Sequence, residues 1–380
     1  MKLPGAPSET RDRALRQPDA LSADLGRAVE ELPTPALILD LAAAKRNMAV
    51  MRDRIAMLPA ELRPHVKAHK SPDIARLQLE HGAIGVTTAT VAEADAMARA
   101  GVPDILIANQ VVAAPAIDRA VAVAALTRIT VAVDDLDNLR TLASGAAAAG
   151  TMLGVVVEVD VGMGRGGART TEEALTLAGR AAELPGIELR GLMGYEGHCA
   201  DEPDVERRER EVRASMARLV LVADRCRAAG LGIQIVTAGA TGTYRFAGGY
   251  PGVTEVQAGS YVLMDRFHEP LAPEFECAIA VLTTAISRHG DLVVFDAGRK
   301  GIGTELRPPD PPGPGAKLAF VHEEHLGVRF PGGTPYRVGD RIALVPGYAP
   351  SAVNLFGAYN VVDGGKVVDV WPVVGRHGTG

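Results

Sequence analysis

Short apolar runs alternate with alanine-rich amphipathic stretches over residues 61–275, a pattern typical of repeated strand–helix units. Three of the helices are expected at Val91–Ala100, Thr171–Leu184 and Val205–Ala229. Eight units predict a closed parallel (β/α)8 barrel, or TIM barrel, in an α/β protein. Its strands are expected at Leu62–Val66, Gly85–Ala89, Ile105–Ala108, Ile129–Val133, Gly154–Val159, Leu189–Gly194, Ile233–Thr237 and Thr254–Ala258.

The pattern changes at residue 276, after which strand-like runs follow one another without helices between them. This predicts a second, all-β domain over residues 276–380. Its proline-rich segment 308–314 is expected to be an exposed loop, because proline cannot continue a sheet. The strand-like runs are Ala278–Ile286, Leu292–Asp296, Leu318–Val321, Arg341–Val345 and Asn354–Val370.

Two segments precede the barrel. Residues 1–33 mix proline, serine and charged residues without a sustained period, which favours a mobile or loosely docked extension. Residues 34–60 are expected to form a strand, Ala36–Leu39, and a helix that leads into the barrel. Because this strand precedes the first barrel strand, it is a candidate to pair with the all-β domain.

Composition favours an enzyme that acts on a small molecule over a nucleic-acid-binding or membrane protein. The formal charge is −6 and basic residues are scattered among acidic ones. No apolar stretch approaches the roughly 20 residues that a membrane-spanning helix needs. The three cysteines, Cys199, Cys226 and Cys277, form no CxxC pair, and the N-terminus has no apolar signal core. We therefore expect a cytoplasmic protein.

Chemically active residues follow five of the expected barrel strands, where barrel enzymes place their sites. Lys67 follows the first strand, Arg165 the fifth and His198 the sixth. The segments Gly239–Thr243 and Gly259–Tyr261 follow the seventh and eighth, the usual place for a phosphate. All five positions are therefore expected on one rim.

Lys67 lies among cations in the segment Arg63-Pro-His-Val-Lys-Ala-His-Lys70. Its neighbours His65 and His69, together with desolvation, would lower the pKa of its amine and make it a nucleophile. A surface basic turn is the alternative.

Three further groups have both a functional and a structural interpretation. The glycine-containing loops offer backbone N–H groups and hydroxyls to an anion, but glycines at strand ends are also ordinary turns. Arg165, in a glycine-rich loop, could approach a planar ligand or pair with Asp160. Tyr195 and His198 could contact a ring or belong to a structural polar network.

At these residues the chain resembles the D-threonine aldolase and D-serine dehydratase family, whose members share the alanine racemase type of pyridoxal-5′-phosphate (PLP) fold. The resemblance runs from Pro33 to Pro372. It rests on Thr34-Pro-Ala-Leu, Arg63-Pro-His-Val-Lys-Ala-His-Lys-Ser-Pro72, Ile105-Leu-Ile-Ala-Asn109, Asp160-Val-Gly-Met-Gly-Arg165, Gly239 to Tyr244, Glu255-Val-Gln-Ala-Gly-Ser-Tyr-Val-Leu-Met-Asp265 and Val370-Trp-Pro372.

The resemblance implies a PLP site with Lys67 as the Schiff-base lysine and Arg165 near the cofactor's phenolic oxygen. It also implies a homodimer, because the fold-related enzymes complete their site with the partner's β domain. The other residues expected around the cofactor and its phosphate are His65, Tyr195, Gly239, Thr241, Gly242, Thr243, Gly259, Ser260 and Tyr261.

The chain departs from the family where relatives commonly hold a divalent metal with a histidine and an aspartate or cysteine. Here the segment is Pro346-Gly-Tyr-Ala-Pro350, so Tyr348 and Pro350 occupy these places, and proline offers no side-chain donor. A divalent metal is therefore not expected. Smaller departures are Ala238, Ala240 and Leu326, where the family would carry glycine.

The segment His322-Glu-Glu-His325 is a weaker metal candidate. It lies in a β-like run, where alternation would put His322 with Glu324 on one face and Glu323 with His325 on the other. It lacks the helical HExxH spacing of a zinc protease.

The function that the resemblance favours is a lyase that cleaves or forms the Cα–Cβ bond of β-hydroxy-D-amino acids. Without a metal, the β-hydroxyl would be activated by His69, His198, His325 or Tyr348. An amino-acid racemase or epimerase that uses Lys67 and Tyr348 is the main alternative. A dehydratase is disfavoured, because it would have to expel hydroxide without a Lewis acid. Tyr348 could also simply fill the space of a metal site. A protein that carries PLP without catalytic turnover is a third class of function.

Overall fold

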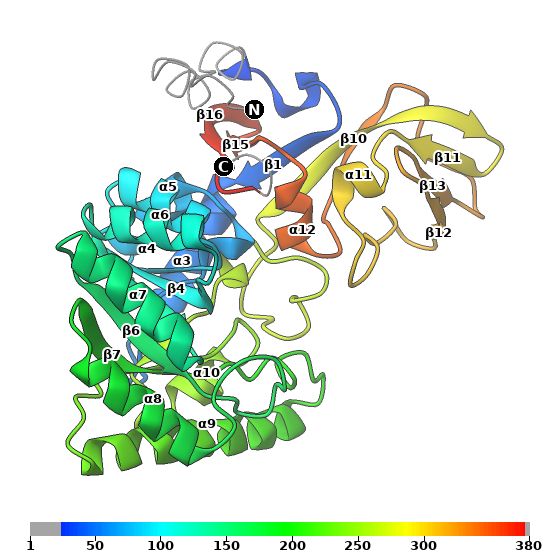
Figure 1. Ribbon diagram of the computed structural model, residues 1–380. Helices are drawn as coiled ribbons and strands as arrows, with labels where there is room; N and C mark the ends of the chain where they lie inside the picture. The colour runs from blue at the N-terminus through cyan, green and yellow to red at the C-terminus, as the bar shows by residue number, and fades with distance from the viewer. Residues whose placement is uncertain (1–23, 377–380) are drawn as a thin grey trace, which may run out of the picture.

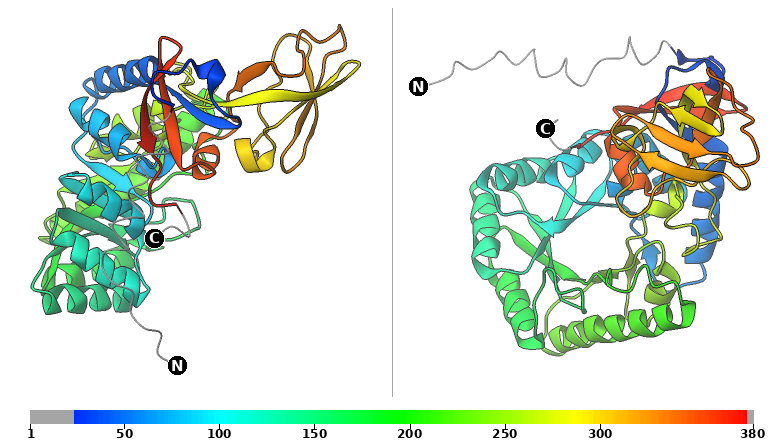
Figure 2. Two further views of the ribbon diagram at one scale, coloured as in Figure 1. Left: turned by 90° about the horizontal axis from the view of Figure 1, so that it is seen from above. Right: turned by 90° about the vertical axis from the view of Figure 1, so that its right-hand side faces the viewer.

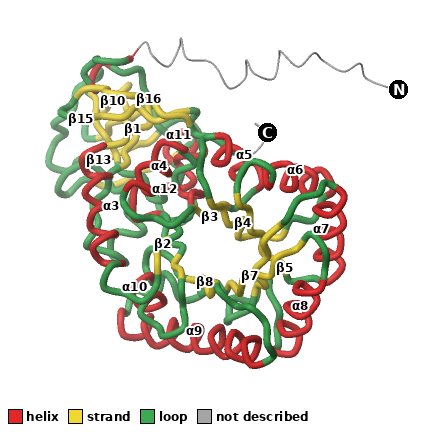
Figure 3. The backbone as a smooth tube through the Cα atoms, turned by 90° about the vertical axis from the view of Figure 1, so that its left-hand side faces the viewer, coloured by secondary structure: helices red, strands yellow, loops and turns green. Residues whose placement is uncertain are grey.

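The computed structural model describes residues 24–376 and contains two eight-stranded sheets. The first is parallel, in the order β2-β9-β8-β7-β6-β5-β4-β3. An isolated parallel bridge between His65 and Thr87 joins its two ends, which closes the barrel. Figure 3 shows the ring of strands with the helices outside it. The predicted barrel is therefore confirmed. Its strands are β2 Glu61–Leu62, β3 Val86–Thr88, β4 Asp104–Gln110, β5 Arg128–Val133, β6 Leu153–Glu158, β7 Ile187–Met193, β8 Ile235–Ala238 and β9 Glu255–Val256.

Helices cover the outside of the barrel because its strands are apolar on both faces. One residue from each of five neighbouring strands forms a small buried cluster of its own: Leu106, Ala132, Val156, Met193 and Ile235. Their sequence neighbours belong to the large core that the helices complete. The helices of this half are α3 Leu41–Ile55, α4 Pro72–Glu80, α5 Val91–Arg99, α6 Ala114–Ala124, α7 Leu136–Ala148, α8 Thr171–Glu183, α9 Val205–Ala228 and α10 Tyr244–Gly248.

The second sheet has the order β12-β13-β11-β10-β1-β15-β16, with β14 paired to β10. Strand β1, Ala36–Asp40, lies between β10 and β15, so the start of the chain belongs to this sheet. Figures 1 and 2 show the sheet beside the barrel. Its other elements are β10 Ile279–His289, β11 Leu292–Phe295, α11 Arg299–Ile302, β12 Lys317–Val321, β13 Leu326–Arg329, β14 Arg341–Leu344, α12 Ala349–Asn354, β15 Ala358–Asp363 and β16 Lys366–Pro372.

Three local expectations were wrong. The first barrel strand ends at Leu62, and residues Val66–Ala68 form a 3-10 helix instead. The run expected as one strand from Asn354 to Val370 starts at the end of α12 and then divides into β15 and β16, since two glycines at positive φ, Gly364 and Gly365, turn the chain.

The segment from His322 to His325 is also not a strand. It is the tight connection between β12 and β13, in which the His322 N–H donates to the His325 carbonyl. The alternating faces inferred for its side chains therefore do not exist.

The N-terminal extension was expected to be mobile or loosely docked. Residues 1–23 lie outside the described residues. Residues 24–33 pack against the second sheet, where Gly26 N–H donates to the Val367 carbonyl and Leu32 is fully buried. Among residues 24–376, no helix is long and apolar enough to cross a membrane.

Candidate active site

A cavity of about 340 Å³ opens at the carboxyl ends of the barrel strands, next to the second sheet. Its walls come from seven barrel strands, either from their carboxyl ends or from the loops that follow them, and from a loop of the second domain. The lining residues are His65, Lys67, Ala68, Ala89, Ala108, Asn109, Arg165, Met193, Gly194, Tyr195, Ala238, Gly239, Ala240, Thr241, Gln257, Gly259, Ser260, His268 and Tyr348.

Lys67 enters this cavity from the 3-10 helix Val66–Ala68. The cavity leaves its side chain accessible, yet protein atoms surround the amine on most sides. Burial lowers the pKa of the Lys67 amine, and the charge of Arg165 lowers it further. The amine therefore loses its proton more readily than that of a free lysine, as a nucleophile requires.

The ring of Tyr195 lies beneath both cations. Lys67 Nζ is 5.6 Å from its ring centroid and the Arg165 guanidinium is 5.3 Å from it. Such contacts stabilise a cation by its attraction to the π face. Burial raises the pKa of Tyr195 to about 12, so its hydroxyl stays protonated. The Lys67 amine and the Arg165 guanidinium therefore lie close to the same ring.

Two loops beside the cavity, one after β8 and one after β9, contain backbone N–H groups without a hydrogen-bond partner. Within residues 24–376, the N–H groups of Thr241, Gly242 and Gly259 donate to no protein acceptor. Gly259 approaches the His65 carbonyl so closely that a Cβ there would lie 2.2 Å from the oxygen. Unpaired amides on loops after the last two barrel strands suit an anion such as phosphate.

A buried carboxylate holds the first of these loops. Glu196 accepts hydrogen bonds from the Thr243 hydroxyl at 2.5 Å and from the Gly239 N–H at 3.1 Å. Burial raises the pKa of Glu196. The Thr243 hydroxyl is therefore engaged with Glu196 and does not reach the cavity.

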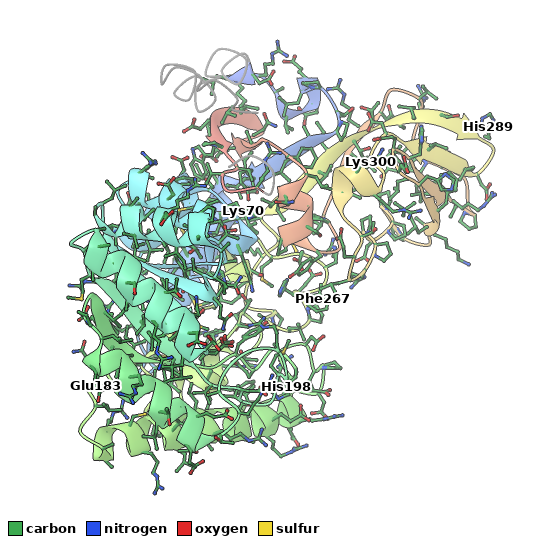
Figure 4. The ribbon with its side chains drawn as sticks, viewed as in Figure 1. Lys70, Glu183, His198, Phe267, His289 and Lys300 are labelled. Atoms are coloured by element: carbon green, nitrogen blue, oxygen red, sulfur yellow. The ribbon has the colours of Figure 1, made fainter. Side chains whose placement is uncertain are left out.

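The second domain contributes Tyr348, whose ring stacks on His268 at 5.7 Å between centroids. His268 is the important residue that the sequence interpretation missed. Its Nδ1 lies 2.8 Å from Oδ1 of the fully buried Asp265, and its ring lines the cavity. The available signal was the Asp-x-x-His spacing directly after the Gly259–Tyr261 loop. Figure 4 labels Phe267, which lies where the two domains meet and contacts the Tyr348 ring edge-on.

Both parts of the chain match known protein families. Residues 39–266 match the alanine racemase N-terminal domain, and residues 278–362 match a putative serine dehydratase domain. D-threonine aldolase from Arthrobacter sp. and 3-hydroxy-D-aspartate aldolase from Paracoccus denitrificans are each 35% identical to the chain, over 92% of it and 94% of their own length.

The chain belongs to the alanine racemase-fold family that contains these aldolases. The structure of D-threonine aldolase from Filomicrobium marinum superimposes with a TM-score of 0.90 at 32% identity, covering 93% of this chain and 98% of that one. D-threo-3-hydroxyaspartate dehydratase from Delftia sp. superimposes with a TM-score of 0.81 at 26% identity, covering 91% and 98%. This membership supports a PLP-dependent lyase.

PLP, which the family implies, fits the residues present. One cavity is lined by a lysine whose amine pKa is lowered and by unpaired backbone amides. The amine suits the aldehyde of the cofactor and the amides suit its phosphate. Thr241, Gly259 and Ser260 line the cavity itself, and Gly242 lines a smaller one beside it.

Several expected site residues lie away from the cavity. Within the described chain, His69 is fully buried and bonded to Gln78, and Tyr261 is buried with its hydroxyl accepting from the same amide. His198 is exposed on a turn beside Gly162, and His325 is exposed in the β12–β13 connection. Of the four side chains expected to activate a β-hydroxyl, the structure brings Tyr348 to the cavity.

The segment where the resemblance led us to expect no metal offers few donor atoms. Pro350 lies in the first turn of α12, and the ring of Tyr348 is stacked against His268. Across residues 24–376, no group of three or more histidine, cysteine, aspartate or glutamate side chains is arranged to hold a metal ion.

Proposed function

We propose that the protein is an aldolase that converts β-hydroxy-D-amino acids and an aldehyde plus glycine into one another. The observation that carries this proposal is that the Lys67 amine and the unpaired amides of the Thr241 and Gly259 loops open into one cavity. The kinship with D-threonine and 3-hydroxy-D-aspartate aldolases supplies the class of substrate.

In this proposal different cavity residues bind different parts of the cofactor. Lys67 would hold the cofactor covalently, Arg165 would lie near its ring oxygen, and the amides after β8 and β9 would hold its phosphate. When bound, PLP supplies an electron sink for the pair released at Cα. His65, whose pKa burial holds well below its ordinary value, stays neutral beside Lys67 and adds no competing charge.

A racemase is the second candidate, because Tyr348 reaches the cavity from the second domain. A tyrosine that removes a proton must first lose its own. Burial and the charge of Asp265 raise the pKa of Tyr348, so at neutral pH the hydroxyl stays protonated. This favours a hydrogen-bond donor over a base and disfavours racemisation.

The test is a chiral product assay on the purified protein loaded with PLP. D-threonine, D-serine, D-3-hydroxyaspartate and their L-forms are supplied separately, with Lys67→Ala as the negative control. The aldolase should release glycine and an aldehyde from a D-substrate. Formation of the L-enantiomer, or of a keto acid and ammonia, would instead identify a racemase or a dehydratase.

The same assay tests the metal. We expect activity to be unchanged by EDTA, because Pro350 has no donor atom and Tyr348 is a poor replacement for a metal-binding imidazole. Activity that chelation abolishes and manganese or zinc restores would contradict this proposal. The search for ligands would then return to His322, Glu324 and His325.

A further inference from the structure

The cavity contains an imidazole whose two nitrogens have different surroundings. His268 Nδ1 contacts both oxygens of Asp265, at 2.8 and 2.9 Å. Its Nε2 makes no hydrogen bond to any residue within 24–376, and the ring lines both the main cavity and the adjoining one of about 180 Å³. The side chain is only 13% exposed.

Asp265 is well placed to set the tautomer of this ring. The carboxylate is fully buried and also accepts N–H groups from His268 at 2.8 Å and from Ala349 at 2.7 Å. A carboxylate surrounded by donors requires the proton of a neutral imidazole to lie on Nδ1. The lone pair of Nε2 is then free, as a general base requires.

Other groups around the cavity are less suited to take a proton. Tyr348, stacked on the ring, stays protonated, and Tyr195 does so too. The Arg165 guanidinium offers only N–H donors and no acceptor. Lys67 is committed to the cofactor in the proposed function. The remaining titratable side chains at these walls are His65, which is buried against Lys67, and Asp201 in the adjoining cavity.

We propose that His268 is the general base that takes the β-hydroxyl proton in the cleavage direction, with Asp265 as its positioning residue. This rests on the proposed aldolase function. The O–H proton passes to Nε2 and the O–H electron pair becomes the second bond of the aldehyde carbonyl. The Cα–Cβ pair moves to Cα, which then takes a proton. The sum is glycine and an aldehyde, with no oxidant and no net proton.

The central variant is His268→Gln, compared with the exposed His289→Gln at the far end of β10 (Figure 4). Cleavage of D-threonine should fall by about 100- to 10,000-fold in kcat for His268→Gln, the range typical of lost acid–base catalysis, with KM changed little. The control should match the unmodified protein. Exchange of the glycine Cα hydrogen in D2O, which involves no β-hydroxyl, should be retained.

These measurements distinguish failure of the proposed aldolase function from failure of the role assigned to His268. If the unmodified protein cleaves no β-hydroxy-D-amino acid, the proposed function fails. If it does cleave and His268→Gln keeps a kcat within about threefold, the base is another group. Loss of cleavage and glycine exchange together would also overturn the assignment, because it would mean that His268 only supports the fold or the cofactor.

Asp265→Asn tests the positioning role without relying on activity. In the unmodified protein, proton NMR should show a low-field signal for the His268 Nδ1–H that is absent in His268→Gln. An asparagine that turns its NH2 toward Nδ1 would move the ring proton to Nε2, so this signal should disappear and kcat should fall. An unchanged signal and unchanged kcat would contradict the role of Asp265.

Discussion

At the scale of single residues, the site combines one reactive amine with side chains that control where protons lie. Burial lowers the pKa of Lys67 and raises the pKa of Tyr348, and both shifts have the same physical cause. Desolvation disfavours the charged form of each group. The amine becomes available as a nucleophile while the phenol remains a donor.

Tyr348→Phe should therefore have a modest effect. The change removes one neutral hydroxyl and keeps the ring that stacks on His268. A lost neutral hydrogen bond is worth about 1 kcal/mol, which corresponds to a several-fold decrease in kcat. Steady-state kinetics on D-threonine measure it. A decrease of 100-fold or more would transfer the role of proton acceptor from His268 to Tyr348.

His69 gives a prediction for stability against pH. Its Nδ1 accepts the Ser71 N–H at 3.1 Å, and its pKa is lowered from 6.5 to about 3, chiefly by burial. At a pH between these two pKa values, His69 binds a proton in the unfolded chain but not in the folded chain. The free energy of unfolding should therefore fall as pH falls through this window, by up to about 1.4 kcal/mol per pH unit for this group.

Urea unfolding at pH 6.5 and pH 5 measures this effect. His69→Gln should show a smaller loss of stability between the two conditions than the unmodified protein. His289→Gln, which changes an exposed imidazole, should lose as much as the unmodified protein does. An equal loss in all three proteins would show that His69 does not contribute.

At the scale of elements, the proposed phosphate site depends on two loops that other parts of the chain hold in place. The loop after β9 passes the His65 carbonyl, which stands just before Lys67 in the chain. The loop after β8 is tied to Glu196. The loop after β9 is therefore held beside Lys67 by a backbone contact, and the loop after β8 is held by a buried side chain.

Gly259→Ala should disrupt this wall. The added methyl would lie 2.2 Å from a backbone oxygen, which must move and displace Lys67 with it. We expect a loss of PLP affinity of at least tenfold and a lower melting temperature, by analogy with other overpacked sites. Gly232→Ala, where no atom lies within 4 Å of the new methyl, is the matched control. Equal affinities in the two variants would contradict the role of this close approach.

At the scale of the whole molecule, the sequence predicted what depends on order along the chain. Successive parallel strands of a barrel point the same way, so residues just after each strand meet at one rim. That rule, with the family resemblance, predicts from the sequence alone that Lys67, Arg165 and the glycine-containing loops lie together.

What the sequence could not predict depends on contacts between distant segments. His268 and Tyr348 meet because Arg266 and Phe267 donate their N–H groups to the carbonyls of Pro346 and Gly347, about 80 residues later in the chain. No local pattern encodes this pairing. For the same reason, His69 stands near Lys67 in sequence but points into the core toward Gln78.

We also predict a homodimer in solution. Leu306, at the adjoining cavity, is a large apolar side chain that is 52% exposed, and symmetric pairs are the commonest assembly of identical chains. Light scattering during turnover should give twice the mass of the chain. A fully active monomer would show that one chain completes the site alone.

The central claim is that Lys67 holds the cofactor, and borohydride reduction followed by peptide mapping tests it most directly. The protein loaded with PLP should absorb at about 410–430 nm before reduction, and the mass of the reduced cofactor should lie on the peptide that contains Lys67. Lys67→Ala should lose both signals. Modification of Lys70, which is paired with Glu93, or of Lys300 in the second domain would contradict the account.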